Sequence, residues 1–427
     1  MSYPETYYKN TMTDLRRHPT PLSGNVECDT VIVGGGLAGL TTALQLARAG
    51  QSVVIVEAQL VGFGASGRNG GFVAPGFATD NEAIARKVGA DAARRLQALS
   101  IEGVDFVRNT IDELDIVAAA PCPGIMSVTR YEDGPNLKAY AEHMRDEHDY
   151  PLEYWDRDHV RSVLKSDRYF QGLRDTRAFH IHPLNYLLAL AAEFERLGGK
   201  IYENSSATAS DFTKAEKRIR TSTGEVRARH VVLTTGGYTG SLERRLKRAF
   251  LPIATYVMVS EQDPDLIRQA IVTSDAIGDN RRAGDYYRFV EGGKRILWGG
   301  RITTHAASTA TLVRELRREM TTTFPQLKNL KTEFAWSGLM SYARHLMPQV
   351  GELQPGVWHC TAFGGHGLNT TAIAGKVVAE GILGASERYK MFRPFGLVWA
   401  GGPVGLAAAQ LTYWKLQMQD WWRERAA

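Results

Sequence analysis

The chain has 427 residues, of which 44% are hydrophobic and 23% are charged, and its formal net charge is +5. This length is too great for one ordinary domain and fits two, and the composition excludes a disordered chain. The densest basic stretch, residues 244–248, is typical of a solvated helix face, so the charge gives little support to nucleic-acid binding.

The cysteines and the N-terminal residues bear on the compartment. Cys28, Cys122 and Cys360 are widely spaced and form no C-x-x-C, which predicts neither disulfides nor a metal site and suits a reducing compartment. The N-terminal segment lacks the apolar core of a secretory signal, and no run of about 18 apolar residues occurs. We therefore expect a cytoplasmic protein. The apolar C-terminal residues suggest an alternative, in which the protein binds peripherally to the inner membrane.

The first predicted elements are a strand, a tight turn, a helix and a second strand. Asp29 to Val33 is a short β-branched run, as a buried parallel strand requires. Apolar residues from Leu40 to Ala47 recur at helical spacing, and Gln51 to Val56 forms the second strand.

Gly34, Gly36 and Gly39 have the G-x-G-x-x-G spacing between the first strand and the helix. Such glycines allow a tight turn, a close approach to a pyrophosphate and close helix packing, and the helix N-terminus, which includes Leu37 and Ala38, favours anions. Glu57 follows Gly39 by 57 − 39 = 18 residues, at the end of the second strand, where a carboxylate accepts from ribose hydroxyls. Together with Ala58, these residues predict a dinucleotide site. The alternative is a glycine-rich turn with a surface glutamate.

A second glycine-rich loop follows at once, from Gly62 to Phe72. Backbone amides that glycines leave accessible can line a diphosphate and a ring system, and polar side chains add donors. The residues that we assign to the cofactor here are Gly64, Ala65, Ser66, Arg68, Asn69, Gly70, Gly71 and Phe72. The alternative is a mobile surface turn.

The pattern of apolar residues predicts helix over residues 81–115. From 118 to 174, strand-like and helix-like segments alternate. A helix and a strand follow from His182, then a strand over 226–234 that ends in a glycine-rich turn. Residues 285–301 predict a hairpin through Glu291-Gly292-Gly293. A third glycine loop then opens a helix after an apolar strand, and its amides suit an anionic ring edge; its cofactor candidates are Gly365, His366, Gly367, Leu368, Asn369 and Thr370. An ordinary helix N-cap with nothing bound is the alternative.

At these loops the chain resembles the D-amino-acid-oxidase-type flavoprotein superfamily, and within it the γ-glutamylputrescine oxidase-like group. The motifs that carry the resemblance are VIVGGGLAGL, EAQLVGFGASGRNGG, HPLNYLLALAAEFERLGGKIYEN, ILWGGR and FGGHGLNTTAIAGKVVAE, in this order. The resemblance runs from about Tyr7 to the apolar tail. It implies FAD as the cofactor, an antiparallel sheet over the flavin, and oxidation of a C–H beside nitrogen to an imine that water hydrolyses.

The expected fold class is α/β, with a discontinuous Rossmann-type FAD-binding domain and an α+β substrate domain that has a mostly antiparallel sheet. We assign residues 25–120, 176–245 and 346–390 to the FAD-binding domain, and 121–175 and 246–345 to the substrate domain. Residues 391–427 form an apolar or amphipathic tail. Ala207, Thr235 and Gly236 are added to the cofactor site, and FAD is expected to be non-covalent because the second loop has neither His nor Cys.

Two departures from the superfamily concern the substrate and the electron acceptor. Amino-acid oxidases carry an arginine in a W-x-G-x-R stretch that clamps the substrate carboxylate, and the matching position in WSGLMSYARHLMPQVG is Met340. This argues against a simple α-amino acid, although Arg344 lies nearby. Sarcosine-oxidase relatives place a lysine near the flavin, and ILWGG (residues 296–300) has none, so both dioxygen and a quinone remain open as acceptors.

The candidate catalytic residues are His366, Trp298, Tyr287, Met340 and Arg344. An aromatic wall would exclude water and hold an amine, whereas the alternative for the aromatic residues is the core. The leading function is FAD-dependent oxidation of a primary or secondary amine, such as a γ-glutamylputrescine-like molecule. The alternatives are a membrane-associated amine or amino-acid dehydrogenase that passes electrons to quinone, and a non-catalytic flavin-binding protein.

The tail carries one apolar helical stripe, formed by Ala407, Leu411, Trp414, Met418 and Trp421. The favoured interpretation is that this stripe packs on its own domain or on a second subunit of a homodimer. The alternative is a peripheral membrane contact, because Trp and Arg together are favoured at a headgroup boundary.

Overall fold

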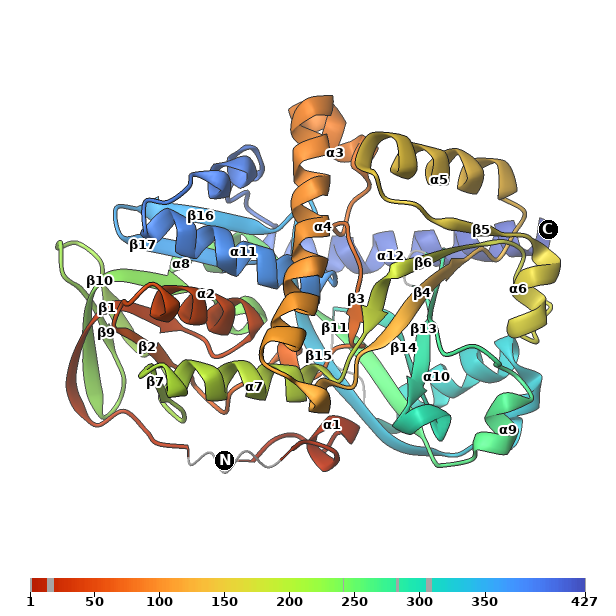
Figure 1. The fold of residues 1–427 in the computed structure, drawn as a ribbon, viewed down its shortest axis with the longest axis horizontal. Coiled ribbons are helices and arrows are strands. Elements are labelled where there is room, and N and C mark those ends of the chain that lie inside the picture. The colour runs from red at the N-terminus through yellow and green to blue at the C-terminus, as the bar shows by residue number, and fades with distance from the viewer. Residues whose placement is uncertain (1, 14–18, 241, 282–283, 305–308, 427) are drawn as a thin grey trace.

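Two β-sheets organise the part of the chain that the computed structural model describes, residues 2–13, 19–240, 242–281, 284–304 and 309–426. The sheets lie on either side of the long helix α4 (Ala90–Glu113), as Figure 1 shows. The predicted α/β class with two different sheets is confirmed.

The first sheet has eight strands, in the order β16-β17-β10-β1-β2-β7, with β8 and β9 attached to β10. Pairing is parallel from β17 through β10, β1 and β2 to β7. The strands of this sheet are β1 (Gly24–Val33), β2 (Val53–Val56), β7 (Lys200–Tyr202), β8 (Ala209–Asp211), β9 (Lys217–Arg220), β10 (Gly224–Leu233), β16 (Gln349–Gln354) and β17 (Val357–Thr361). All four residues of β2 are buried, which explains its uninterrupted apolar run.

Helix α2 (Leu37–Arg48) packs against both α7 (Pro183–Arg196) and α11 (Gly367–Ile382), and α4 crosses α11. The crossing is close, because a Cβ on Gly103 of α4 would lie 2.5 Å from the carbonyl oxygen of Asn369 in α11. These helices and β1, β2 and β17 share one apolar core, which fixes the N-terminal ends of α2 and α11 at the same edge of the sheet.

The second sheet has nine strands, in the order β15-β11-β14-β13-β12-β4-β6-β3, with β5 attached to β6. It is mostly antiparallel, and the pair β12–β4 is parallel. Its strands are β3 (Phe72–Val73), β4 (Cys122–Val128), β5 (Glu153–Trp155), β6 (Gly172–His180), β11 (Phe250–Ser260), β12 (Ala276–Asp279), β13 (Tyr286–Val290), β14 (Arg295–Thr303) and β15 (Thr332–Ala343). The predicted hairpin is therefore confirmed as β13–β14. The domain boundaries stay a prediction, and β3 is a short strand of this sheet inside a segment assigned to the FAD-binding domain.

The remaining α-helices lie outside the two sheets. They are α1 (Tyr7–Asn10), α3 (Asn81–Val88), α5 (Gly134–His148), α6 (Arg157–Val163), α8 (Arg244–Arg248), α9 (Pro264–Arg268), α10 (Thr309–Thr323) and α12 (Gly402–Ala426). The 3₁₀ helices are η1 (Ala65–Gly67), η2 (Val117–Ala119), η3 (Gly236–Tyr238), η4 (Glu291–Gly293), η5 (Pro325–Asn329) and η6 (Arg388–Phe395).

The C-terminal stripe does form a helix, α12, which runs along the back of the molecule in Figure 1. Its apolar residues do not pack on their own domain, because Leu411, Trp414, Met418 and Trp421 are all exposed to solvent. The helix does contact its own domain, through Gln410 and Glu424 on its other side, but the apolar stripe itself does not pack there. Packing of the stripe on a second subunit stays a prediction. Within the described residues, no helix has the length and apolar character needed to cross a membrane.

Candidate active site

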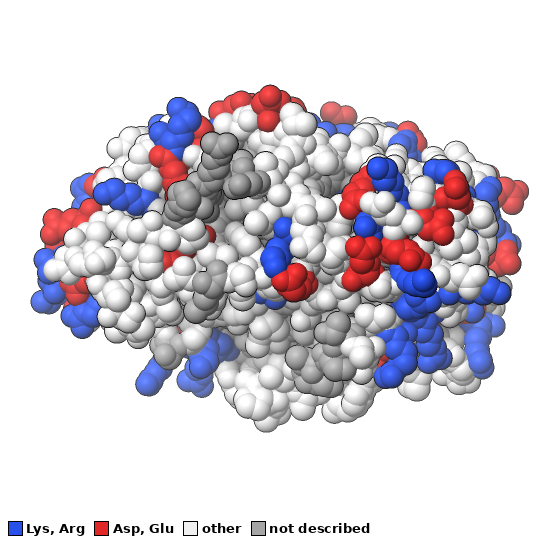
Figure 2. Space-filling model, turned by 90° about the horizontal axis from the view of Figure 1, so that it is seen from below, with Lys and Arg blue, Asp and Glu red and all other residues white. Residues whose placement is uncertain are grey.

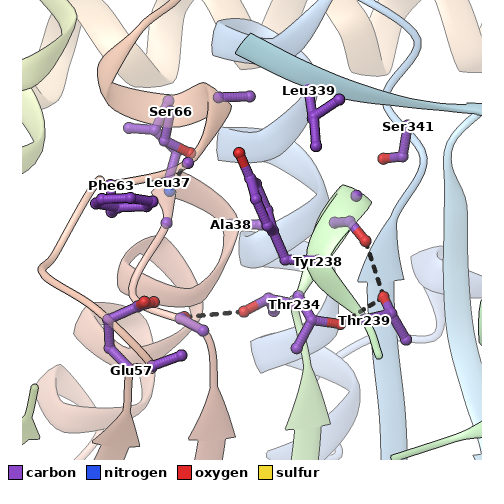
Figure 3. Close-up of a pocket in the computed structure, with 18 of the residues that line it drawn as sticks. Leu37, Ala38, Glu57, Phe63, Ser66, Thr234, Tyr238, Thr239, Leu339 and Ser341 are labelled. Atoms are coloured by element: carbon purple, nitrogen blue, oxygen red, sulfur yellow. Dashed lines mark hydrogen bonds between the residues drawn. The ribbon is translucent and has the colours of Figure 1, made fainter. Parts of the chain in front are cut away.

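A cavity of about 480 Å³ lies at the carboxyl ends of β1, β2 and β10, where the predicted glycine loops meet. Figure 3 shows Glu57 on one side, Ser66 and Phe63 of the second loop above it, and Leu339 and Ser341 across the cavity. The predicted cofactor residues that line it are Gly34, Gly36, Leu37, Ala38, Glu57, Ala58, Gly64, Ala65, Ser66, Asn69, Ala207, Thr235, Gly236, Gly365 and Gly367. Met340 lines it as well.

The turn between β1 and α2 requires its glycines for two separate reasons. Gly34 has a φ of +113°, and a Cβ there would lie 2.9 Å from the carbonyl oxygen of Thr234. A Cβ on Gly39 would lie only 2.1 Å from the carbonyl oxygen of Gly34. Gly39 therefore does not face the cavity; it lets α2 lie directly on the turn, as its place in the motif predicts.

The N-terminus of α2 opens into the cavity. The hydroxyl of Ser66 accepts a hydrogen bond from the Leu37 amide at 3.0 Å, which ties the second loop to the first. The Leu40 amide is the first in α2 to bond within the helix, to Gly36, so the amides before it have no intrahelical acceptor. A narrow, glycine-lined space at a helix N-terminus fits a diphosphate.

Glu57 extends the end of β2 at the other side of the turn. Its Oε2 accepts from the Gly35 amide at 2.7 Å, and its Oε1 accepts from the Gln59 amide at 2.8 Å. Burial raises the pKa of the carboxyl group, and these backbone donors oppose the shift. Each oxygen retains acceptor capacity toward the cavity, as a ribose diol requires.

The second loop is held by its own side chains. The amide nitrogen of Asn69 donates to the carbonyl oxygens of Ser66 at 2.8 Å and Ala65 at 3.2 Å. Arg68 donates to the carbonyl oxygens of Phe63 at 2.7 Å and Ser337 at 3.2 Å. These contacts shape the loop. Asn69 also lines the cavity, whereas Arg68 does not, and the expected role of both as donors to a ligand stays a prediction.

The third loop brings β15 to the cavity. Gly364 and Gly365 have positive φ values of +61° and +90°. A Cβ on Gly365 would lie 2.9 Å from the Tyr342 hydroxyl and 3.4 Å from the Met340 sulfur atom, so both side chains of β15 reach the loop. Burial raises the pKa of Tyr342 to about 12, which keeps its hydroxyl protonated at neutral pH.

Several predicted residues of these loops do not line the cavity. The Gly70 carbonyl accepts from Arg288 at 2.6 Å, and the Gly71 carbonyl accepts from the Ile181 amide at 2.8 Å. Asn369 donates to carbonyl oxygens of Gly76 and Ser100. None of these three residues lines the cavity. The same holds for five other predicted cofactor residues, which are Arg68, Phe72, His366, Leu368 and Thr370.

Sequence reasoning missed several residues that line the cavity, among them Phe63, Leu339 and Ser341, and two from the turn after β10. Tyr238 and Thr239 line the cavity, and Figure 3 shows Tyr238 at its centre. Its ring lies against Gly64, where an added Cβ would be 3.3 Å from the ring. The signal was available, because TTGGYTG follows a buried strand that pairs with β1, and the carboxyl ends of parallel strands meet at one edge.

Four of the five catalytic candidates lie away from the cavity lining. Trp298 and Tyr287 stack at 4.4 Å between ring centroids in a separate core beneath α10, fully buried. His366 is exposed at the N-cap of α11, and Arg344 is exposed after the end of β15. Side chains alternate along a strand, so Tyr286, the neighbour of Tyr287, faces the second loop instead. A Cβ on Gly70 would lie 2.6 Å from its ring.

Tyr287→Phe is expected to lower the free energy of unfolding by about 1 kcal/mol and to leave kcat/KM unchanged. The Tyr287 hydroxyl donates to the Tyr169 hydroxyl at 3.1 Å inside the core, and the substitution removes this bond alone. Thermal unfolding and steady-state kinetics check both parts. A raised KM with an unaltered free energy of unfolding would instead indicate that Tyr287 contacts the substrate.

The parallel sheet, the glycine turn at a helix N-terminus and the carboxylate after β2 define a dinucleotide-binding enzyme fold. The chain belongs to the DAO family of FAD dependent oxidoreductases, whose model matches residues 29–381. It is therefore an FAD-dependent oxidoreductase, and the cavity has the groups that FAD needs: amides for the diphosphate and an acceptor for the ribose.

Among its relatives, γ-glutamylputrescine oxidoreductase of Escherichia coli (strain K12) is 33% identical over 373 residues, which cover 87% of each chain. The glycine oxidase of Geobacillus kaustophilus has the same fold, with a TM-score of 0.74 and 18% identity over 87% of this chain and 99% of the other. The L-amino acid deaminase of Proteus vulgaris has a TM-score of 0.73 and 16% identity, covering 89% and 99%.

Glu57→Gln is expected to weaken FAD binding by about 1–2 kcal/mol, because a charge-assisted bond to the ribose becomes a neutral one. The pH dependence has a definite sign. Burial raises the pKa of Glu57 in the absence of FAD, so affinity should fall as pH decreases through this pKa and should be flatter in the variant. Titration of the apoprotein with FAD at several pH values measures both the loss of affinity and its pH dependence. Full affinity in the variant would show that Glu57 does not contact FAD.

Proposed function

We propose that this enzyme oxidises the C–N bond of a small amine, γ-glutamylputrescine-like or another primary or secondary amine. The substrate would lose a hydride equivalent from carbon and a proton from nitrogen. Water would then add to the imine and release an aldehyde or keto product with ammonia or an amine. FAD supplies the two-electron acceptor chemistry, and the protein supplies binding, orientation and electrostatics. The 33% identity to γ-glutamylputrescine oxidoreductase supports this class of substrate.

The observation that carries the proposal is the absence of a cationic side chain from the cavity lining. Among the described residues, Glu57 is the one charged residue that lines the cavity. In Figure 3 it lies at the opposite end from Leu339 and Ser341, the two neighbours of Met340 in β15. Leu339, Met340 and Phe363 make the Met340 end apolar. A carboxylate on the reacting carbon would be desolvated there without a partner, which is costly. We therefore favour a substrate whose oxidised carbon carries no carboxylate.

The chain's own residues have separate tasks in this proposal. The amides at the start of α2 hold the diphosphate, and Glu57 accepts from the ribose. The N-terminus of α11 stabilises negative charge on the flavin ring, and the apolar wall beside Met340 excludes water and favours the uncharged amine. No His or Cys occurs among the described residues that line the cavity, so we propose non-covalent FAD, which acid precipitation should release.

The electron acceptor is dioxygen or a quinone. No lysine lines the cavity within the described part of the chain, which gives no support to a dioxygen-activating cation and favours the quinone. Stopped-flow mixing of the substrate-reduced enzyme with dioxygen, and separately with a soluble quinone, distinguishes the two acceptors. Faster reoxidation by the quinone supports a dehydrogenase.

The amine assignment is tested by anaerobic mixing of the holoenzyme with amines and amino acids while flavin absorbance is followed. Bleaching by γ-glutamylputrescine or another amine without a carboxylate on the reacting carbon supports the proposal. Bleaching by α-amino acids alone would contradict it.

A further inference from the structure

Helix α12 is oriented with its polar side toward the protein and its apolar side toward solvent. Its exposed large apolar residues have between 46% and 75% of their surface accessible; they are Val404, Leu411, Trp414, Met418, Trp421 and Trp422. Val398 and Trp399, just before the helix, are exposed as well. A continuous exposed apolar surface of this kind marks an interaction site rather than a scattered set of side chains.

The inward side of α12 is held by polar contacts. The side-chain oxygen of Gln410 accepts from the amide and the hydroxyl of Thr304, at 3.2 and 3.3 Å. Glu424 lies 3.8 Å from Arg281 and 3.9 Å from Arg168. Asp420 is buried on the same side. Because these contacts fix the rotation of the helix, the outward position of the tryptophans follows from the fold.

The same rotation places the acidic and the basic side chains of the helix differently. Its two carboxylates, Asp420 and Glu424, face inward, whereas Lys415, Arg423 and Arg425 are exposed. The guanidinium group of Arg425 lies 3.8 Å from the ring centroid of Trp421. Arg423 lies over the ring of Tyr131, with 5.7 Å between its guanidinium carbon and the ring centroid, and so faces the protein. The charged side chains on the outward face are therefore cations, Lys415 and Arg425.

A second group of cations lies at the other end of this surface. The Ala400 amide donates to the carbonyl oxygen of Arg248 at 2.9 Å, which places the start of α12 beside α8. Arg244, Lys247 and Arg248 of α8 are exposed. The side of the molecule where α12 lies forms the lower edge of Figure 2, which shows uncharged surface in the middle and Lys and Arg toward both ends.

We propose that the outward face of α12, with the cations of α8, binds the surface of a membrane that contains anionic phospholipid. The tryptophans and Met418 would enter the boundary between headgroups and acyl chains, and the cations would contact lipid phosphates. A second copy of this chain fits less well. Antiparallel packing of two α12 helices would bring Arg425 beside the cations of α8, and parallel packing would bring the two copies of Arg425 beside each other.

The test is flotation of the full-length holoenzyme with vesicles of phosphatidylcholine, alone or with phosphatidylglycerol. The protein should float with the anionic vesicles and should be released as salt concentration rises. Trp414→Gln/Met418→Gln and Lys415→Gln/Arg425→Gln should each weaken binding by about tenfold or more. Val272→Gln is the matched control, because Val272 is 53% exposed outside α12 and its substitution should change nothing.

Because the substituted side chains are exposed, the variants should keep their FAD and their melting temperature. Binding that is equal for neutral and anionic vesicles, or no binding to either, would overturn the proposal. A dimer seen in sedimentation analysis would also overturn the proposal if Trp414→Gln/Met418→Gln dissociated it, because a second copy of the chain would then cover the outward face of α12. None of these readouts depends on the substrate or the acceptor.

Discussion

Gly39→Ala is expected to yield protein that retains almost no FAD, with affinity reduced by about 3 kcal/mol, or at least about 100-fold. The added Cβ would lie 2.1 Å from the Gly34 carbonyl oxygen and 2.8 Å from the Thr234 hydroxyl oxygen. Both contacts involve groups that cannot retreat, since the Thr234 hydroxyl donates to that same carbonyl at 3.0 Å. Helix α2 would have to move away from the turn, and its amides would move with it.

The flavin content of the purified variant and titration of its apoprotein with FAD measure this effect. Gly278→Ala is the matched control, because a Cβ there meets nothing within 4 Å and the change is the same single methyl group. Normal FAD content in Gly39→Ala would mean that α2 does not position the diphosphate. Equal losses in both variants would point to a general effect on folding.

Met340→Arg is expected to raise kcat/KM for small α-amino acids relative to uncharged amines by about 10- to 100-fold. Met340 lines the apolar end of the cavity, where its sulfur atom approaches Gly365. An arginine there would offer two parallel donors to a carboxylate, which is worth about 1.5–3 kcal/mol. The sequence resemblance implies that this position matches the arginine of the superfamily's amino-acid oxidases.

Met340→Leu is the control for this experiment, because it conserves volume and adds no charge, and it should leave the ratio unchanged. Steady-state kinetics with a matched amine and amino acid gives the ratio directly. If a folded, flavin-loaded Met340→Arg enzyme keeps the wild-type ratio, Met340 does not face the substrate.

The first turn was predictable from the sequence because its requirements are local. Gly34, Gly39 and Glu57 follow from spacing alone, since a strand, a tight turn and a helix leave few places for them. The second and third loops were predictable as segments but not residue by residue. Which of Arg68, Asn69 or Asn369 faces a ligand depends on tertiary contacts. All three bond to backbone carbonyl oxygens, and Asn69 is the one of the three that also lines the cavity.

For the aromatic candidates and the C-terminal tail, the sequence did not show which side of an element faces the rest of the protein. Neighbours on a strand face opposite sides, so the choice between Tyr286 and Tyr287 required knowing which side of β13 faces α10. The sequence led to Tyr287, whereas Tyr286 is the one that faces the second loop. For α12, periodicity predicted the stripe and the helix but carried no information on which side faces the protein. Gln410 and Glu424, which decide the matter, find partners that are distant in sequence.

Anaerobic titration of the holoenzyme tests the central claim most directly. Flavin absorbance is followed as matched pairs of compounds are added, each pair an amine and the α-amino acid that differs from it by a carboxylate on the reacting carbon. The apolar cavity end beside Met340 predicts that the amine of a pair bleaches the flavin faster. Faster bleaching by the amino acids throughout, or no bleaching by any amine, would contradict FAD-dependent amine oxidation as the activity of this protein.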